Sequence, residues 1–187
     1  MVGNVFAIIL AFMRMSQKPW LKYPARIYIS FMRGVPMLVV LFILYFGLPY
    51  VGIQIPALLY AIIGFSTVSA AYMAEIFRSS ISAVDKGQWE AAQSLGLPQK
   101  PIIRHIILPQ ALRIAVAPTC NVIIDMVKSS SLAAMITVPN LFQNAKIIGG
   151  REYDYMSMYI LIAFIYWVLS FILELLQGQV EKRLTVY

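Results

Sequence analysis

Residues 90–109 read Glu-Ala-Ala-Gln-Ser-Leu-Gly-Leu-Pro-Gln-Lys-Pro-Ile-Ile-Arg-His-Ile-Ile-Leu-Pro and form a polar, basic stretch in a chain that is 60% hydrophobic. Just before it, Asp85 and Gln88 have the spacing of a capping box, so we expect a short helix to begin there. Gly96 would end that helix in a left-handed conformation, and Pro98 suits the first turn of a second helix. The stretch therefore predicts two helices separated by a sharp turn.

The first of these helices has features of a docking surface. Ala91 and Ala92 give it a face with almost no side chain, so another protein could approach its backbone closely. Trp89, beside Glu90, belongs to a residue type that often anchors protein interfaces. Taken alone, Glu90 is better explained as a first-turn acid favoured by the helix dipole, and Gly96 as a generic helix cap, than as docking residues. The full spacing of the stretch favours docking.

The order of fixed residues matches a known signature. Glu-Ala-Ala, three residues, Gly, nine residues and Ile-x-Leu-Pro resembles the cytoplasmic loop of the membrane-spanning subunits of ATP-binding-cassette (ABC) importers. Further motifs resemble the branch that carries polar amino acids: Arg33-Gly34-Val35-Pro36, Tyr45-Phe46-Gly47-Leu48-Pro49, Tyr72-Met73-Ala74-Glu75-Ile76-Phe77-Arg78, Gly87-Gln88 and Lys128-Ser129-Ser130-Ser131-Leu132. Over about residues 14–183 the chain is thus similar to the binding-protein-dependent transport system inner membrane component family.

This resemblance implies an all-α integral membrane protein, a multi-span helical bundle of the type I ABC importer kind. The chain would be the permease subunit, which translocates a polar amino acid delivered by an extracytoplasmic solute-binding protein. It would not be an enzyme and would bind no cofactor, because ATP and Mg²⁺ would be bound by separate ABC ATPase subunits. A second permease copy or a paralogue would complete a dimer. We assign coupling to the ATPase to Trp89, Glu90, Ala91, Ala92, Gly96, Ile106, Leu108 and Pro109.

Composition independently indicates a membrane protein. Only 12% of the 187 residues are charged. The formal net charge of +7 raises the possibility of a nucleic-acid partner, but the basic residues lie in clusters between apolar runs. Such clusters are typical of loops that face the anionic cytoplasmic surface of a lipid bilayer. The single Cys120 excludes an intrachain disulfide, and the sequence contains no cluster of Cys and His that predicts a metal site.

Apolar runs divide this single permease domain, 1–187, into about five spans. The first run is short: at about 1.5 Å per residue it covers little more than half of a hydrocarbon core about 30 Å thick. Because family members have more sequence before this point, we interpret it as the inner half of a truncated first span. The expected segments are a partial span at 1–13, a helical hairpin of 34–48 and 56–77, a cytoplasmic coupling loop at 85–109, a span at 109–128, an outer segment at 129–154 and a last span at 155–177.

The distribution of basic residues predicts the orientation in a bacterial cell membrane. Twelve of the fifteen Lys and Arg residues lie in the segments 14–33 and 78–113 and in the C-terminal tail. By the positive-inside rule these segments are cytoplasmic, and we expect 14–33 to be a loop. The N-terminus would then lie outside and the C-terminus inside.

A polar group near the outer end of the 109–128 span is a candidate for the substrate pathway, because ionisable residues in membrane segments are costly. Asp125 would receive an ammonium group, and Lys128 or nearby hydroxyls a carboxylate. A mutual Asp125 to Lys128 pair explains the same residues equally well. Glu75 likewise has a structural explanation as a helix-end pair with Arg78. The candidate pathway residues are Glu75, Asn121, Asp125, Lys128, Ser129, Ser130 and Ser131.

Two other classes of function are weaker. An ATPase-independent secondary transporter or channel subunit would often show two similar halves, which this sequence lacks. An intramembrane enzyme would call for a His-Glu-x-x-His or Gly-x-Ser-x-Gly pattern, and neither is present. The chain also has no Gly-x-x-x-x-Gly-Lys-Ser/Thr loop for nucleotide phosphates, so the energy for an importer must come from a partner.

Overall fold

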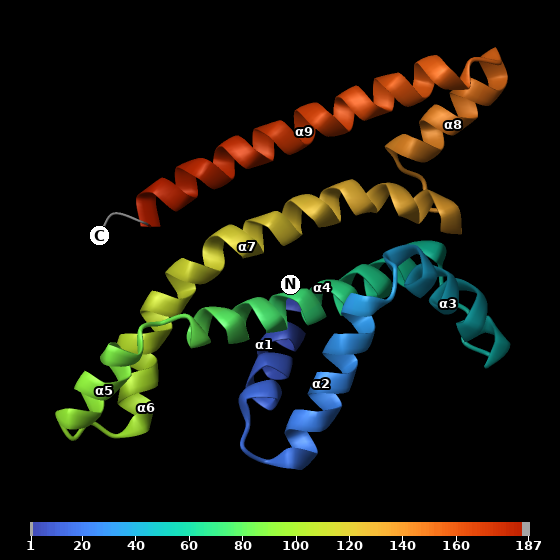
Figure 1. Ribbon diagram of the computed structural model, residues 1–187. Coiled ribbons are helices and arrows are strands. Elements are labelled where there is room, and N and C mark those ends of the chain that lie inside the picture. Colours follow the sequence, from blue (N-terminus) through green and yellow to red (C-terminus); the bar gives the residue numbers. More distant parts are fainter. Residues whose placement is uncertain (1, 185–187) are drawn as a thin grey trace.

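The computed structural model describes residues 2–184, with side chains over 5–183, and this part of the chain contains helices and no strand (Figure 1). Helices α4, α7 and α9 are the long elements, and α5 and α6 lie together beside the start of α7. The elements are α1 (Val2–Met15), α2 (Pro19–Gly34), α3 (Met37–Tyr50), α4 (Ala57–Ser82), α5 (Lys86–Ser94), α6 (Gln99–Pro101), a π segment (Ile102–Ile107), α7 (Leu108–Ser129), a 3₁₀ segment (Ser130–Ile136), α8 (Leu141–Glu152) and α9 (Tyr155–Leu184).

Within the described residues, three helical stretches are long and apolar enough to cross a membrane: Ala57–Ser82, Gln99–Ile136 and Tyr155–Arg183. Helices α2 and α3 meet the same criteria together, but they are bent by 104° where they join. The apolar part of α1, Val5–Met15, is a shorter helix. These elements confirm the all-α, multi-span architecture that the sequence predicts, with three spans in the described residues, or four if α2 and α3 form one bent span.

The segment 14–33 differs from the expected loop, because most of it is helix α2. Its two buried residues, Ala25 and Ile29, are 1% and 4% exposed and belong to the apolar cluster that joins α1, α2 and α4. Pro19 stands in the first turn, where its missing N–H has no intrahelical partner to lose. Lys22, Arg26 and Arg33 therefore lie on a packed helix, which their charge alone did not indicate.

Helix α4 packs against α1 through small residues. Ala70 and Ala74 are fully buried one turn apart, and Ala7 and Ala11 of α1 belong to the same cluster. Small side chains let membrane helices approach closely, which favours van der Waals packing where lipid offers no hydrophobic driving force. The α1 and α2 helices are therefore fixed to the middle of α4.

The α3 to α4 turn is held by a tyrosine. The Tyr60 hydroxyl accepts a hydrogen bond from the Ile55 N–H and donates one to the Ile53 carbonyl, both at 3.1 Å. Gly52 precedes these residues with φ +84°, a conformation that L side chains rarely adopt. Within the hairpin, Gly64 lets Leu41 of α3 lie against the α4 backbone.

Helix α9 follows α8 through a tight reversal. Tyr153 adopts a left-handed φ of 56°, and a Cβ at Gly149 would lie 3.1 Å from the Tyr155 Cα, so glycine permits the close return. Asp154 caps α9 by accepting a hydrogen bond from the Ser157 N–H at 3.1 Å. Hydrogen bonds from the Ser157 hydroxyl and N–H hold the pKa of the Asp154 carboxyl below its usual range.

Candidate coupling and substrate sites

Helix α5 is capped at its start by Asp85. The Asp85 carboxylate accepts a hydrogen bond from the Gly87 N–H at 2.7 Å, and its carbonyl accepts one from the Gln88 N–H at 3.1 Å. The second half of the expected capping box is not formed, because the Gln88 amide oxygen instead accepts from Gln110 of α7 at 3.2 Å. The helix therefore begins where the sequence predicts, but with a different role for Gln88.

Gly96 ends α5 as expected. Its φ is +71°, its N–H donates to the Gln93 carbonyl at 2.9 Å, and the Leu97 N–H donates to the Ala92 carbonyl at 3.4 Å. This pair of bonds is the Schellman motif, which satisfies the last carbonyls of a helix. Pro98 then lies at the cap preceding α6 and not, as expected, inside its first turn.

The helix that carries the end of the signature begins ten residues before the expected 109–128 span. It runs without a break from Gln99 to Ile136 and includes the π segment. In that segment the Leu108 N–H bonds to the Ile103 carbonyl, five residues back. Pro109 follows and has no N–H to donate. A π turn inside a long helix is often found at a functional site.

An apolar cluster joins α5 to this long helix. Val84, Ala92, Ile102, Ile107 and Ala111 are each 5% exposed or less, and Trp89 and Ile106 pack partly buried against them. Ala92 therefore faces inward. The sequence analysis expected Ala91 and Ala92 to form one docking face together, and for Ala92 this expectation is wrong. Trp89 also contacts this cluster. The two residues hold α5 in place.

The outward face of α5 consists of other residues. Glu90 and Ala91 are exposed, and Leu95 is 78% exposed although it is a large apolar residue. At the far end of the signature, Leu108 and Pro109 are exposed on the long helix. These exposed residues are the part of the predicted coupling surface that stays accessible once α5 is packed on the long helix.

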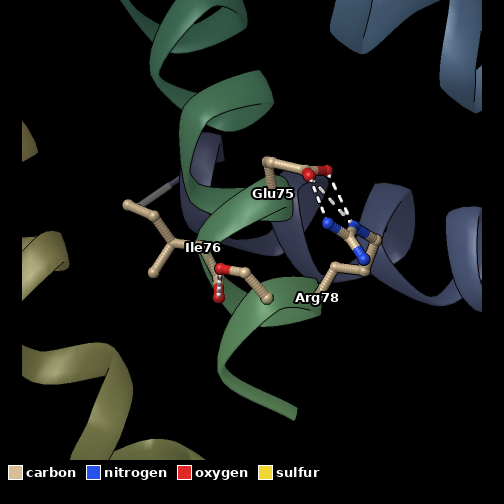
Figure 2. A network of polar contacts seen from close by, with 4 residues as sticks. Glu75, Ile76 and Arg78 are labelled. Atoms are coloured by element: carbon tan, nitrogen blue, oxygen red, sulfur yellow. Dashed lines mark hydrogen bonds and ion pairs between the residues drawn. The ribbon is translucent and has the colours of Figure 1, made fainter. Parts of the chain in front are cut away.

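Glu75 and Arg78 form an ion pair one turn apart on α4. The Arg78 Nε lies 3.0 Å from both Glu75 carboxylate oxygens, and Figure 2 shows the guanidinium turned back onto the carboxylate. The Glu75 side chain is 20% exposed and the Arg78 side chain is 33% exposed. The pair lies toward the α5 end of α4 and each side chain satisfies the charge of the other, so the geometry favours the structural explanation of Glu75.

The remaining candidates do not form one site. Lys128 Nζ lies 3.0 Å from Asp125 Oδ1, and both side chains are well exposed. The Ser130 and Ser131 hydroxyls donate to the carbonyls of Val127 and Lys128 at 2.7 and 2.9 Å. Hydroxyls used in this way can still accept a bond but have no proton free to donate. Ser129 is the exception, because it lines a cavity.

Asn121 contacts α9 instead of the other polar residues. The Asn121 side-chain oxygen accepts a hydrogen bond from Gln177 Nε2 at 3.0 Å. Gln177 Nε2 also donates to Glu181 Oε1 at 2.8 Å. Hydrogen bonds between helices contribute about 1 kcal/mol in membranes. Asn121 therefore has a structural function in fixing α9 to α7.

A cavity of about 300 Å³ lies between the α2 to α3 bend, α4 and α7. The Arg33 guanidinium stands 5.5 Å from the centroid of the Tyr72 ring, and Ser129 closes the α7 side. The sequence analysis placed Arg33, Tyr72 and Ser129 in family motifs without connecting them. The full lining is Arg33, Gly34, Val35, Pro36, Met37, Val68, Tyr72, Met126 and Ser129.

Sequence reasoning also missed the residues that hold α5 against the long helix. Ile102, Ile107 and Ala111 share one buried face although their spacings are five and four. A spacing of five fits a face that passes through a π turn, whereas an α-helix would place Ile106 on the same face as Ile102. The five-residue spacing of Ile102 and Ile107 was therefore the sequence signal that could have predicted this buried face. The hydrogen bond between Gln88 and Gln110 could not be predicted from local sequence, because 22 residues separate the two side chains.

Comparison with known proteins gives a consistent result. The family model for the binding-protein-dependent transport system inner membrane component matches residues 3–186. The chain is 59% identical over 185 residues to the probable amino-acid ABC transporter permease protein YckA of Bacillus subtilis, covering 99% of this chain and 82% of the relative. It is 40% identical over 186 residues to the L-cystine transport system permease protein TcyB of the same organism, covering 99% and 80% of the two chains.

Solved structures agree. A crystal structure of an amino acid ABC transporter with histidines superposes with a TM-score of 0.94 at 37% identity, covering 97% of this chain and 85% of that one. The MetNI methionine ABC transporter in an inward-facing conformation shares the fold, with a TM-score of 0.76 at 20% identity over 98% and 86% of the two chains. The chain therefore belongs to the family of inner membrane components of binding-protein-dependent transport systems, and it is a membrane-spanning permease subunit of an ABC importer.

Proposed function

We propose that this chain translocates a polar amino acid across the cell membrane, driven by ATP hydrolysis in separate subunits. The observation that carries the proposal is the coupling unit, a capped α5 helix packed on the long α7 helix with Glu90, Ala91 and Leu95 facing outward. Relatives named as amino-acid and L-cystine permeases, and a solved transporter with histidines, support the substrate class.

The outward face of α5 is the proposed docking surface for the ATPase. The buried cluster of Ala92, Ile102 and Ile107 joins α5 to the start of α7, and Val84 adds the end of α4. Close-packed interiors transmit displacement instead of absorbing it. Movement of α5 with the ATPase would therefore move α4 and α7. ATP and Mg²⁺ belong to the ATPase, and the signature residues of this chain take part by docking.

The remaining partners follow from the proposed orientation. The coupling unit, the α1 to α2 turn and the C-terminal end of α9 would lie in the cytoplasm, and the α3 to α4 turn and α8 outside, where a solute-binding protein delivers the amino acid. A second copy or a paralogue would cover one apolar face of the chain, and membrane lipid the others.

We place the substrate path beside the cavity lined by Arg33, Tyr72 and Ser129 rather than at the Asp125 to Lys128 pair. The pair satisfies its own charges at 3.0 Å, so it offers little to a zwitterion. The cavity combines a guanidinium, an aromatic ring and a hydroxyl in a volume of about 300 Å³. A guanidinium forms paired hydrogen bonds with a carboxylate, the group that all amino acids share.

The test is uptake into proteoliposomes that hold this chain with its ATPase subunit and receive the solute-binding protein with radiolabelled cystine, glutamine, histidine or arginine. The expected result is accumulation of at least one of these amino acids that requires ATP, with a loss of uptake in the Arg33→Ala variant and normal uptake in the Arg151→Ala control on α8. Uptake that proceeds without the ATPase would contradict the proposal and favour a secondary transporter or channel.

A further inference from the structure

A pair of glutamine side chains connects the coupling helix to the long helix. Gln110 Nε2 on α7 donates to the Gln88 Oε1 on α5 at 3.2 Å and to the Ile106 carbonyl at 3.0 Å. The two residues are 22 positions apart, so the bond joins separate elements. Outside the buried cluster, this is a direct side-chain contact between α5 and α7.

The location of Gln110 gives the bond a structural purpose. It follows Pro109, which has no N–H, and the π segment, where the Leu108 N–H bonds five residues back. The regular α-helical hydrogen bonding is interrupted at this point, and the Gln110 side-chain amide donates to the Ile106 carbonyl of the π segment. One side chain thus contacts both the π segment and α5.

We propose that Gln110 is a positioning residue, which with Gln88 fixes the rotation of the coupling helix relative to α7. The apolar cluster of Ala92, Ile102 and Ile107 holds the two helices together, but apolar packing is not directional. A hydrogen bond has a preferred length and angle, so it selects one orientation among those that the cluster allows. The inference rests on the proposed function. With a fixed rotation of α5, a movement that the ATPase imposes on α5 displaces α7 by the same amount.

The test compares variants of the full chain assembled with its ATPase and solute-binding protein. For each variant the amino acid transported per ATP hydrolysed is measured, together with retention of the ATPase subunits. Gln88→Leu and Gln110→Leu are each expected to lower that ratio by about threefold to tenfold, the effect of one neutral hydrogen bond. The double variant is expected to lose no more than Gln110→Leu alone, because each single variant already removes the bond between Gln88 and Gln110.

Two further variants make the test specific. Gln88→Glu keeps an acceptor for Gln110 and is expected to keep the normal ratio. Gln17→Leu makes the same replacement in the exposed turn between α1 and α2 and serves as the control. All variants are expected to retain the ATPase, since the proposed docking surface consists of other residues.

Wild-type ratios in both single Leu variants would overturn the inference and leave the proposed function intact. Additive losses in the double variant, or loss of the ATPase from either single variant, would also overturn it, because the two residues would then act separately or in docking. A wild-type assembly without ATP-driven transport would contradict the proposed function itself and this inference with it.

Discussion

At the scale of single residues, Gly96 makes the clearest prediction. Its φ of +71° is the left-handed conformation, where an L side chain costs roughly 1–2 kcal/mol, although a Cβ would meet nothing within 4 Å. Gly96→Ala should therefore lower the free energy of unfolding by about 1 kcal/mol through backbone strain alone. Equilibrium unfolding in mild detergent measures this change.

The matched control is Gly178→Ala on α9. A Cβ at Gly178 also meets nothing within 4 Å, but its φ is not in the left-handed range. Alanine is a better helix former than glycine, so this variant should be neutral or more stable, by up to about 1 kcal/mol. Equal effects at the two positions would contradict the prediction, because the left-handed backbone conformation would then not be the reason that position 96 needs glycine.

Residues whose role depends on neighbours in sequence were predictable. The Asp85 cap and the Gly96 turn are local, and both lie where the sequence analysis placed them. The directions of Ala92 and Gln88 were not, because they depend on contacts with the distant residues Ile107 and Gln110. The coupling roles assigned to the signature residues remain a prediction.

At the scale of elements, the α3 to α4 hairpin makes a second prediction. A Cβ on Gly64 would lie 2.7 Å from Leu41 Cδ2 and 3.3 Å from Leu44 Cδ1, and Leu41 is fully buried. Because Leu41 has little space to move, Gly64→Ala should push α3 from α4 and cost roughly 1–3 kcal/mol of unfolding free energy. The measurement is the unfolding midpoint in detergent.

Gly47 on α3 provides the comparison for this prediction. It lies in a helix of the same hairpin, and a Cβ there would meet nothing within 4 Å. Gly47→Ala should therefore leave stability unchanged or raise it slightly. A Gly64→Ala variant as stable as Gly47→Ala would mean that α3 and α4 are not packed as closely as described.

Element types followed from the sequence more readily than element boundaries. Long uncharged runs predicted α4 and α9 because a bilayer demands span-length apolar helices. The basic segment 14–33 was assigned as a loop, whereas Ala25 and Ile29 form a buried stripe that makes α2 a packed helix. The unbroken helical run from Gln99 to Ile136 was missed, because the π segment that joins the second helix of the coupling loop to the 109–128 span interrupts the α-helical period of the sequence.

At the scale of the whole molecule, large apolar surfaces remain uncovered. Only 11% of the apolar window of α9 is buried, against 44% for α4. In Figure 1, α9 lies at one edge of the molecule and α4 in the middle, which agrees with that difference. Such surfaces are stable in lipid or against another subunit, as expected for a membrane-spanning permease subunit.

The central claim is that α5 docks the ATPase, and co-purification tests it most directly. The chain is purified in mild detergent with the ATPase subunit of its transport system, as wild type, as Glu90→Lys on the outward face of α5 and as Glu152→Lys at the end of α8. Wild type and Glu152→Lys should retain the ATPase, and Glu90→Lys should bind it roughly tenfold more weakly, a difference of about 1.4 kcal/mol. Equal retention by all three chains, or none by wild type, would contradict the claim.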